Sequence, residues 1–470
     1  RFKDEAWREN ALSDLLKQAY LISAQWMLET TDSLEGLNPD LHRQATFWAQ
    51  QVVDAMSPAN FAFSNPEVMA ETARTGGMNL WRGWQNLVAD LRQGRISQVD
   101  SGAFEVGRDL AVTPGKVVYR NRLMELIQYE PTTETVQAVP MLIVPPWINK
   151  YYVMDLRPQN SLYRHLLDAG FTVFTISWKN ADQSLLDLSW DDYMDLGPLD
   201  ALRVVRAITG AEKVNLTGYC LGGIILQVTL AYLAARGEDG AVNTATYFTT
   251  HQDFSNAGDI AVFINRPGVA FLEWLMSASG GYLDGRNLAA TFNMLRANSL
   301  VWNYVVQNYL MGKEPPAFDL LYWNSDGTRV PGKVHSFLVR RFFLENKLMQ
   351  PNGIEVKGVG VDLGRITTPT YAVAGDRDHI VPWQGAFRVR DLQGGPVRFV
   401  LAGGGHIAGI INPPADQKRA YWINEEKDAD PEAWLAAADK TEGSWWPDWF
   451  AWLAERSGNA QAPSPMGSED

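Results

Sequence analysis

The sequence predicts an α/β fold in which a mostly parallel sheet carries helices on both faces. Short runs rich in β-branched residues alternate with helical stretches, and strands that are separated by helices usually pair in parallel. A glycine-rich turn, Gly218 to Gly222, directly follows one of these strands and precedes a helix. The 470 residues are enough for a large core. We therefore expect one extended sheet whose loops carry the functional residues.

The order of the expected elements supports this fold. Residues 1 to about 95 are expected to be helical, since Leu12, Leu15, Ile22 and Trp26 recur at helical spacing, and no strand pattern appears before residue 115. A β-hairpin is expected to start at Gly115. The further expected strands are 140–144, 171–177, 213–217, 244–249, 368–374 and 397–401, and the expected helices between them are 163–167, 191–209 and 221–236.

The alternation of strands and helices stops between about residue 256 and residue 362. This stretch contains aromatic-rich pieces such as Leu300-Val-Trp-Asn-Tyr. We interpret it as an insertion that covers the nucleophile and moves to admit substrate. The expected organisation is a helical N-terminal region over 1–114, the first part of the core over 115–255, a cap over 256–362, and the second part of the core with a C-terminal tail over 363–470.

Composition excludes several classes of protein. The net charge of −13, with no basic tract, argues against a nucleic-acid binder. One cysteine allows no intramolecular disulfide, and the six histidines show no metal-binding spacing, so we expect no metal and no cofactor. The longest uncharged stretch, 214–235, contains several glycines and polar residues and is better explained as strand, turn and helix than as a transmembrane segment.

The candidate nucleophile lies in the turn at residues 218–222. Gly218-Tyr219-Cys220-Leu221-Gly222 has the pattern of the nucleophile elbow of the α/β-hydrolase fold. The turn is so tight that the positions two before and two after the nucleophile must lack side chains. A buried structural cysteine in a glycine-rich turn is the alternative. The position between a strand and a helix favours the catalytic interpretation, so Cys220 is the predicted nucleophile.

The partners of Cys220 follow in the chain order of this fold, which is nucleophile, acid, histidine. Asp376 and Asp378 follow one expected strand, and His406 follows the next, after three glycines. An aspartate after a strand can be only a helix cap, and a histidine in a glycine loop only a surface residue. The three together predict that His406 acts as the base of Cys220 and that one of the two aspartates orients it.

An oxyanion hole requires two backbone N–H donors. One is expected from Leu221, the residue after the nucleophile. The second is expected from the Val144-Pro-Pro-Trp-Ile-Asn-Lys loop; its two prolines have no N–H, so Trp147 or Ile148 is the candidate, and we select Ile148. The alternative is that this loop is only a rigid Pro-Pro turn.

A cysteine in place of serine also indicates the chemistry. Its acyl-enzyme is a thioester, so loading from another thioester is nearly thermoneutral, and transfer of the acyl group to a hydroxyl then runs downhill. This favours an acyl-CoA-dependent transferase over an ester hydrolase, with His406 activating the thiol of Cys220.

Motifs along nearly the whole chain resemble those of the polyhydroxyalkanoate synthases, the poly(3-hydroxyalkanoate) polymerases. These motifs are Asp54-Ala-Met-Ser-Pro-Ala-Asn-Phe, Phe104-Glu-Val-Gly-Arg, Pro145-Pro-Trp-Ile-Asn-Lys-Tyr-Tyr, Gly218-Tyr-Cys-Leu-Gly-Gly, Leu300-Val-Trp-Asn-Tyr, Asp378-His-Ile-Val-Pro-Trp, Gly405-His-Ile-Ala-Gly and Gly443-Ser-Trp-Trp-Pro-Asp-Trp. Together they are far more specific than the elbow alone. The variable N-terminal segment of the family and its Pro-Gly-x-Tyr-Val ending are not in this sequence.

The resemblance implies a function and a set of site residues. It assigns the catalytic roles to Cys220, Asp378 and His406. It implies polymerisation of (R)-3-hydroxyacyl-CoA into polyester with release of CoA, by a homodimer at the surface of polyester granules in the cytoplasm. Tyr219 before the nucleophile, and the Ile-Val-Pro-Trp run after His379, resemble the single-subunit class (class I) that prefers short substrates such as 3-hydroxybutyryl-CoA.

Two other classes of function are alternatives to a polymerase. A cysteine-nucleophile thioesterase or hydrolase of the same fold would use the same residues, and differs only in that water takes the acyl group. A granule-binding protein without activity would need no ordered set of Cys220, Asp378 and His406. Turbidity from polymer, measured alongside release of free CoA, separates the three.

Overall fold

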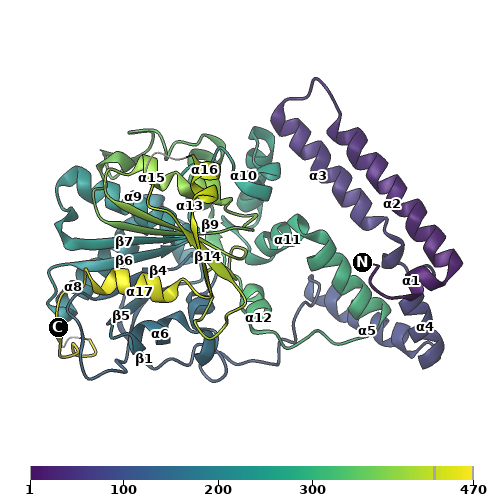
Figure 1. Ribbon diagram of the computed structural model, residues 1–470, viewed down its shortest axis with the longest axis horizontal. Coiled ribbons are helices and arrows are strands. Elements are labelled where there is room, and N and C mark those ends of the chain that lie inside the picture. Colours follow the sequence, from purple (N-terminus) through teal and green to yellow (C-terminus); the bar gives the residue numbers. More distant parts are fainter. Residues whose placement is uncertain (1, 427–429, 468–470) are drawn as a thin grey trace. The chain divides into compact units, whose positions relative to one another are not determined.

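The computed structural model describes residues 2–426 and 430–467 and divides the chain into two compact units. The N-terminal unit comprises the residues up to Phe104 together with Arg286–Ser325. The sheet unit comprises Glu105–Gly285 and the residues from Asp326 onward. Figure 1 shows the helices of the first unit and the strands of the second.

The sheet unit is built on a mostly parallel sheet, as predicted. In its described residues ten strands pair in the order β1-β2-β5-β4-β6-β7-β12-β13-β14-β15. The six from β5 to β13 in this order are parallel, and two antiparallel strands extend each edge. The strands are β1 (Gly115–Arg120), β2 (Met124–Tyr129), β4 (Met141–Val144), β5 (Val173–Trp178), β6 (Val214–Tyr219), β7 (Val242–Phe248), β12 (Thr370–Gly375), β13 (Val397–Ala402), β14 (Ala420–Ile423) and β15 (Asp439–Glu442).

Helices cover both faces of this sheet (Figure 1). Helix α9 (Leu221–Arg236) packs on β4, β6 and β7. Helices α6 (Leu162–Asp168) and α17 (Trp446–Ala454) lie on the other face, where the rings of His165 and Trp446 are 5.1 Å apart. Because both faces are covered, β4, β6 and β12 are buried along their whole length. The remaining helices of the unit are α7 (Trp190–Met194), α8 (Asp200–Thr209), α10 (Arg266–Ala278), α13 (Gly332–Phe337), α14 (Trp383–Phe387), α15 (Val389–Leu392) and α16 (Pro431–Ala436).

Two features of the sheet unit differ from the expectation. The single helix expected over 191–209 is interrupted, because Pro198 has no N–H to donate and Gly197 leaves the helical region at φ −95° and ψ −106°. Strands β14 and β15 were not predicted. All four residues of β15 are exposed, so its sequence has no apolar alternation, and only its backbone pairing with β14 makes it a strand.

In the part of the chain that the structure describes, three further strand pairs lie outside the large sheet and are two residues long on each side. They are β3 (Val136–Gln137) with β16 (Ala460–Gln461), β8 (Tyr282–Leu283) with β9 (Val330–Pro331), and β10 (Glu355–Val356) with β11 (Val359–Gly360).

The N-terminal unit is helical. Helices α2 and α3 form an antiparallel pair in which the hydroxyl of Tyr20 donates to the backbone oxygen of Val53 at 2.9 Å. The helices of this unit are α1 (Ala6–Glu9), α2 (Ala11–Asp32), α3 (Pro39–Ala55), α4 (Pro66–Thr75), α5 (Met78–Gln93), α11 (Gly285–Leu295) and α12 (Asp319–Ser325).

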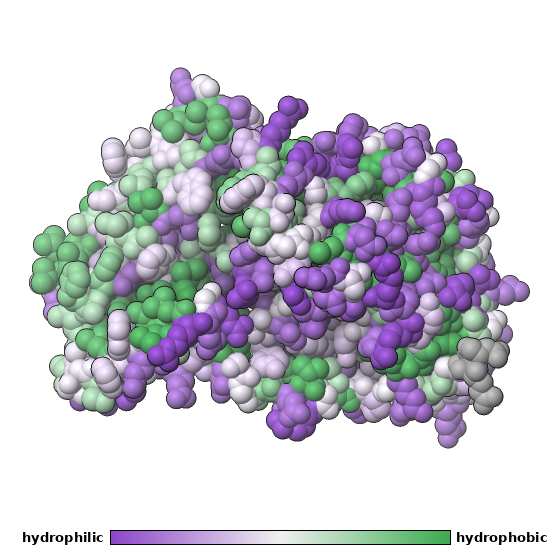
Figure 2. Space-filling model, turned by 180° about the vertical axis from the view of Figure 1, so that it is seen from behind, coloured by the Kyte–Doolittle hydropathy of each residue, from purple (hydrophilic) through white to green (hydrophobic). Residues whose placement is uncertain are grey.

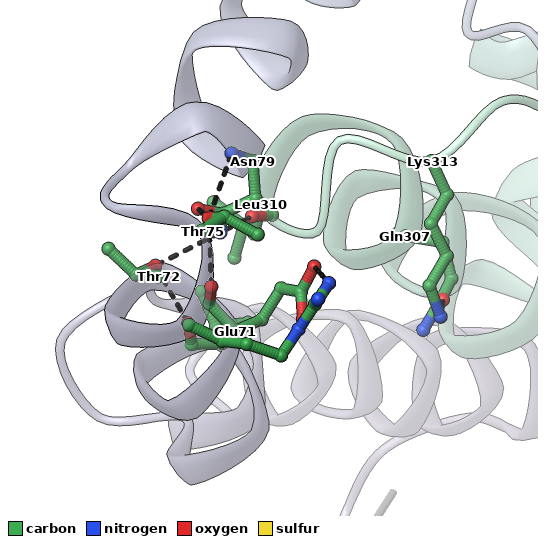
Figure 3. Close-up of polar contacts among 9 residues, drawn as sticks. Glu71, Thr72, Thr75, Asn79, Gln307, Leu310 and Lys313 are labelled. Atoms are coloured by element: carbon green, nitrogen blue, oxygen red, sulfur yellow. Dashed lines mark hydrogen bonds and ion pairs between the residues drawn. The ribbon is translucent and has the colours of Figure 1, made fainter.

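Helix α5 turns its polar side toward the rest of its unit. Its partner is the π-helical segment η9 (Val305–Leu310), where the amide of Asn79 donates to the oxygen of Leu310 at 2.8 Å (Figure 3). A Cβ on Gly83 would lie 1.8 Å from the oxygen of Tyr309, so the two backbones touch. The opposite side of α5 exposes Trp81 and Trp84 by 55% and 56%, and Figure 2 shows hydrophobic atoms gathered over the N-terminal helices.

The stretch expected to form a cap is divided between the two units. Residues 256–285 and 326–362 belong to the sheet unit, whereas 286–325 group with the N-terminal helices. Within the sheet unit the cap stretch approaches the carboxyl end of β7, where the backbone N–H of Phe254 donates to Oδ1 of Asn346 at 2.9 Å. That the whole stretch covers Cys220 and moves stays a prediction. No helix among the described residues is long and apolar enough to cross a membrane.

Candidate active site

Cys220 stands in the turn between β6 and α9. Its φ of 52° and ψ of −117° lie in a region that side chains other than glycine rarely adopt. The backbone N–H of Cys220 donates to the oxygen of Phe248 at 2.9 Å, which ties the turn to the end of β7. Such strain persists only where the surroundings hold it, and it is common at reacting residues. The turn therefore presents the sulfur at the carboxyl edge of the sheet.

The glycines around Cys220 are required by space. A Cβ on Gly222 would lie 1.9 Å from the backbone oxygen of Val144. A Cβ on Gly218 would lie 2.5 Å from Cα of Gly223, and one on Gly223 would lie 2.0 Å from Oγ1 of Thr250. All three approaches are closer than non-bonded carbon and oxygen atoms allow. The sequence pattern is thus explained by the packing of α9 against the strand ends.

Asp378 and His406 are brought together from neighbouring strands. Asp378 follows β12, His406 follows β13, and Oδ2 of Asp378 lies 2.7 Å from Nδ1 of His406. The other oxygen, Oδ1, accepts the N–H groups of Ile380 and Val381, both at 2.9 Å. The side chain of Asp378 is fully buried. With Nδ1 held by the carboxylate, Nε2 is the imidazole nitrogen left for chemistry.

The charges of this pair stabilise each other. Burial lowers the pKa of His406, but the charge of Asp378, the neighbouring Cys220 and hydrogen bonds to both outweigh it and raise that pKa from 6.5 to about 10. Burial likewise raises the pKa of Asp378, but the charge and hydrogen bond of His406, with two backbone N–H groups, bring it below 3.8. At neutral pH the geometry therefore favours a carboxylate beside an imidazolium.

The described residues include no cluster of three or more histidine, cysteine, aspartate or glutamate side chains arranged to hold a metal ion. The site as described consists of a thiol, an imidazole, a carboxylate and backbone N–H groups. Such a set can perform nucleophilic acyl transfer, in which a thiol attacks a carbonyl carbon and an imidazole moves the proton.

Comparisons with known proteins agree with this chemistry. The chain is 45% identical to the poly(3-hydroxyalkanoate) polymerase subunit PhaC of Cupriavidus necator, over 100% of this chain and 80% of that relative. It is 43% identical to the subunit of that name from Rhizobium meliloti, over 99% of this chain and 76% of the relative. It is 44% identical to a poly(3-hydroxyalkanoate) polymerase of Methylorubrum extorquens, over 97% of this chain and 76% of the relative.

Two family profiles also match. The poly-beta-hydroxybutyrate polymerase (PhaC) N-terminus matches residues 1–166, and the alpha/beta hydrolase fold matches residues 139–413. The chain belongs to the poly(3-hydroxyalkanoate) polymerase family. The predicted α/β-hydrolase fold and the predicted acyltransferase class of this enzyme are thereby confirmed.

In this family member, the loop after β4 lies beside the nucleophile elbow. The backbone of Val144 and Pro145 is the surface that a side chain at Gly222 would strike. Thr328 fixes the loop further along, because its hydroxyl donates to the oxygen of Trp147 at 2.6 Å and its N–H donates to the oxygen of Ile148 at 3.2 Å. Both carbonyls are therefore engaged. The assignment of the N–H groups of Leu221 and Ile148 to an oxyanion hole stays a prediction.

Sequence reasoning missed one residue at the site, His251, and named a second, Tyr219, only for its resemblance to the short-chain class, without foreseeing its contact with His406. His251 follows β7 and is buried, with Nε2 3.1 Å from the oxygen of Ile380, and burial lowers its pKa to about 4. Its neutral imidazole thus helps to hold the segment that donates to Asp378. The second is Tyr219, whose ring centroid lies 5.6 Å from that of His406. A histidine directly beyond a strand end, as at position 251, is the signal that would have found the first.

Asp376 was the other candidate for the acid. Its Oδ1 accepts the backbone N–H of Gly404 at 2.6 Å, so the carboxylate is engaged with the loop that carries His406 rather than with the imidazole. The two aspartates therefore have different partners, and geometry favours Asp378 as the residue that orients His406.

Proposed function

We propose that this enzyme polymerises (R)-3-hydroxyacyl-CoA into a polyester, with release of CoA, through a thioester on Cys220. The observation that carries the proposal is the strained nucleophile turn at Cys220 beside an imidazole held at 2.7 Å by Asp378. Relatives with more than 40% identity along the chain are named poly(3-hydroxyalkanoate) polymerases. The acyl-CoA substrate follows from the thioester chemistry of a cysteine nucleophile.

In the loading step, His406 takes the thiol proton of Cys220, and Sγ attacks the thioester carbonyl of the substrate. The C–S bond to CoA breaks, and His406 gives its proton to the leaving CoA thiolate. The raised pKa of His406, about 10, suits this role because the imidazolium is present at neutral pH. The N–H groups of Leu221 and Ile148 stabilise the negative oxygen that forms during the attack.

In the elongation step, the 3-hydroxyl of an incoming 3-hydroxyacyl-CoA attacks the acyl group on Cys220. His406, neutral after loading, takes the hydroxyl proton, an ester bond forms, the C–S bond to Cys220 breaks, and the sulfur of Cys220 leaves as a thiolate beside the imidazolium. Asp378 stabilises the imidazolium that results. The lengthened chain now ends in a CoA thioester, which Cys220 attacks in the next round. One cysteine per chain is enough for this cycle, and the sequence contains only one.

The remaining parts of the proposal concern substrate range and setting. Tyr219 and the run after His379 resemble the short-chain class of the family, so four-carbon 3-hydroxyacyl-CoA should turn over faster than homologues of eight or more carbons. We propose further that the enzyme works as a homodimer at the surface of the polyester granule in the cytoplasm, as the resemblance to the polyhydroxyalkanoate synthases implies.

Incubation with 3-hydroxybutyryl-CoA tests the proposal. We expect free CoA and insoluble polyester in equal monomer amounts from the natural enzyme. Release of CoA with soluble 3-hydroxybutyrate and no polymer would instead establish a thioesterase. Equal or higher specificity constants for the eight-carbon substrate would overturn the proposed short-chain preference.

A further inference from the structure

The loops that carry the acid and the base are joined beyond the end of their strands. The parallel ladder of β12 and β13 ends at the pair Gly375 and Ala402. The backbone N–H of Asp376 still donates to the oxygen of Ala402 at 2.9 Å, and that of Arg377 donates to the oxygen of Gly404 at 3.0 Å. The pairing thus continues for two residues on one side, into the glycine loop before His406.

At Gly404 the connection between the two loops includes a side chain, the carboxylate of Asp376. Its φ of +150° turns the chain, and a Cβ there would lie 2.7 Å from the backbone nitrogen of Gly409, so the loop is compact. The N–H of Gly404 donates to Oδ1 of Asp376 at 2.6 Å. Gly404 is therefore held by both of its backbone groups, one through Arg377 and one through the carboxylate of Asp376. A hydrogen bond to an ionised carboxylate is stronger than one between neutral groups.

We propose that Asp376 is a positioning residue for catalysis: by holding Gly404, it sets the place of His406 relative to Asp378 and Cys220. This inference rests on the proposed function of the site. The geometry is short-range, because His406 is two residues after Gly404 and Asp378 is two residues after Asp376. Any shift of one loop against the other changes the 2.7 Å contact between Asp378 and His406. Displacements of about 1 Å at such a site can lower a rate by about 100-fold.

Four groups from different elements act on His406 or contact it. Asp378 comes from the loop after β12, Cys220 from the nucleophile turn, and His251 from the loop after β7. The hydroxyl of Tyr219 donates to the backbone oxygen of His406 at 3.4 Å. None of these groups is bonded to Gly404, so the carboxylate of Asp376 acts on the loop independently of them.

Two substitutions of Asp376 separate the hydrogen bond from the charge. Asp376→Ala removes the acceptor for Gly404, and we expect kcat for CoA release to fall about 10- to 100-fold with little change in KM. Asp376→Asn keeps an oxygen at the same place, and should retain most of the rate. The alkaline limb of the rate profile should move to lower pH in Asp376→Ala, because His406 loses part of its contact with Asp378 and gives up its proton more easily.

Asp362 offers a matched control. Its Oδ1 accepts the backbone N–H of Gly364 at 3.0 Å, and its side chain is 24% exposed against 29% for Asp376. Both carboxylates also lie near an arginine Nε, of Arg365 and Arg377 respectively. Asp362 precedes β12, whereas the site lies beyond its other end. We expect Asp362→Ala to lower the melting temperature about as much as Asp376→Ala, and to leave kcat and the pH profile unchanged.

A second readout keeps this test separate from the proposed function. Cys220 is the only cysteine, so the rate of alkylation by iodoacetamide reports this thiol alone. We expect slower alkylation at neutral pH in Asp376→Ala than in the natural enzyme or Asp376→Asn. If the natural enzyme releases no CoA from 3-hydroxyacyl-CoA, the proposed function fails while alkylation still tests the role of Asp376. Natural kcat and alkylation in Asp376→Ala, or equal defects in Asp376→Asn and Asp376→Ala, would overturn that role.

Discussion

Helices α9 and α5 are both 16 residues long, and they bury opposite kinds of surface. Helix α9 is buried at every position from Leu221 to Leu233, whatever the side chain. Helix α5 buries Asn79, Gly83 and Asp90, and exposes the tryptophans between them. The sequence pattern of a helix therefore identifies its apolar side, but the element that packs against the helix decides which side is buried.

The cause of the difference is the kind of partner each helix meets. Helix α9 starts at the nucleophile turn and packs on β4, β6 and β7, whose backbone groups pair with neighbouring strands, so these strands offer it mainly side chains to pack on. Helix α5 meets the oxygens of η9. Asn79 and Asn86 satisfy the oxygens of Leu310 and Asn308 at 2.8 Å and 3.0 Å, and Tyr309 donates to Asp90 at 2.6 Å. Polar side chains at every third or fourth position thus become the buried face.

The largest effect is expected where α9 meets the strands. In Gly222→Ala the new Cβ would lie 1.9 Å from the backbone oxygen of Val144, and a backbone atom cannot move aside. We expect the free energy of unfolding to fall by about 3 kcal/mol or more, together with loss of activity. Urea denaturation measures this. Gly240→Ala is the control, because no atom lies within 4 Å of that Cβ, and a change of at most about 0.5 kcal/mol is expected. Equal effects of the two would contradict the account.

The next effect concerns the acid. Asp378→Asn should lower the elongation rate by orders of magnitude, about 10⁴-fold by analogy with related triads. It should spare the loading of Cys220 more, because a thiol needs less help from a base than a hydroxyl does. Single-turnover acylation and steady-state CoA release measure the two steps. A severe defect in Asp376→Asn with a nearly normal Asp378→Asn would show that the acid is the other aspartate.

The third expectation concerns pH. The pKa of His406 is raised from 6.5 to about 10 in the folded enzyme, so its protonated form stabilises the fold. This contribution is complete below pH 6.5 and is lost as the pH rises through about 10. The difference in urea midpoint between the natural enzyme and His406→Gln should therefore shrink over this range. A difference that grows with rising pH would contradict the raised pKa.

The smallest expected effects on the free energy of unfolding concern the two sides of helix α5. Asn79→Ala leaves the oxygen of Leu310 without its donor, and should cost about 1–3 kcal/mol of unfolding free energy. Trp84→Gln changes a side chain that is 56% exposed, and should cost at most about 0.5 kcal/mol. Tryptophan fluorescence during urea unfolding of the full chain measures both. If Trp84→Gln costs more than Asn79→Ala, the apolar side of α5 is covered in solution.

These helices also show how far sequence reasoning reached. The strand at 213–217 and the helix at 221–236 were predicted because glycines mark the turn between them, and the structure has β6 and α9 there. The edge strand β15 was missed, since its four residues are charged or polar and pairing alone defines it. The spacing of Leu12, Leu15, Ile22 and Trp26 correctly predicted a helix, but these side chains are exposed, so the spacing did not identify the buried side of that helix.

At the site, the sequence indicated the candidate residues, and the structure shows which of their side chains contact one another. Chain order and glycine spacing were enough to select Cys220 and His406. They could not separate Asp376 from Asp378 without the resemblance, because two residues after a strand differ only in where the turning backbone points them. They also could not reveal that Asp376 holds Gly404, since that contact joins loops 28 residues apart in the chain.

The most direct test of the central claim is the mass of the protein after brief mixing with 3-hydroxybutyryl-CoA. If Cys220 is the nucleophile, we expect a species heavier by one or more 3-hydroxybutyryl groups, with the added mass on the peptide that contains Cys220, and free CoA released as it forms. Folded Cys220→Ala should gain no mass and release no CoA. Substantial CoA release by folded Cys220→Ala, or added mass on any other residue, would contradict the claim that Cys220 is the nucleophile.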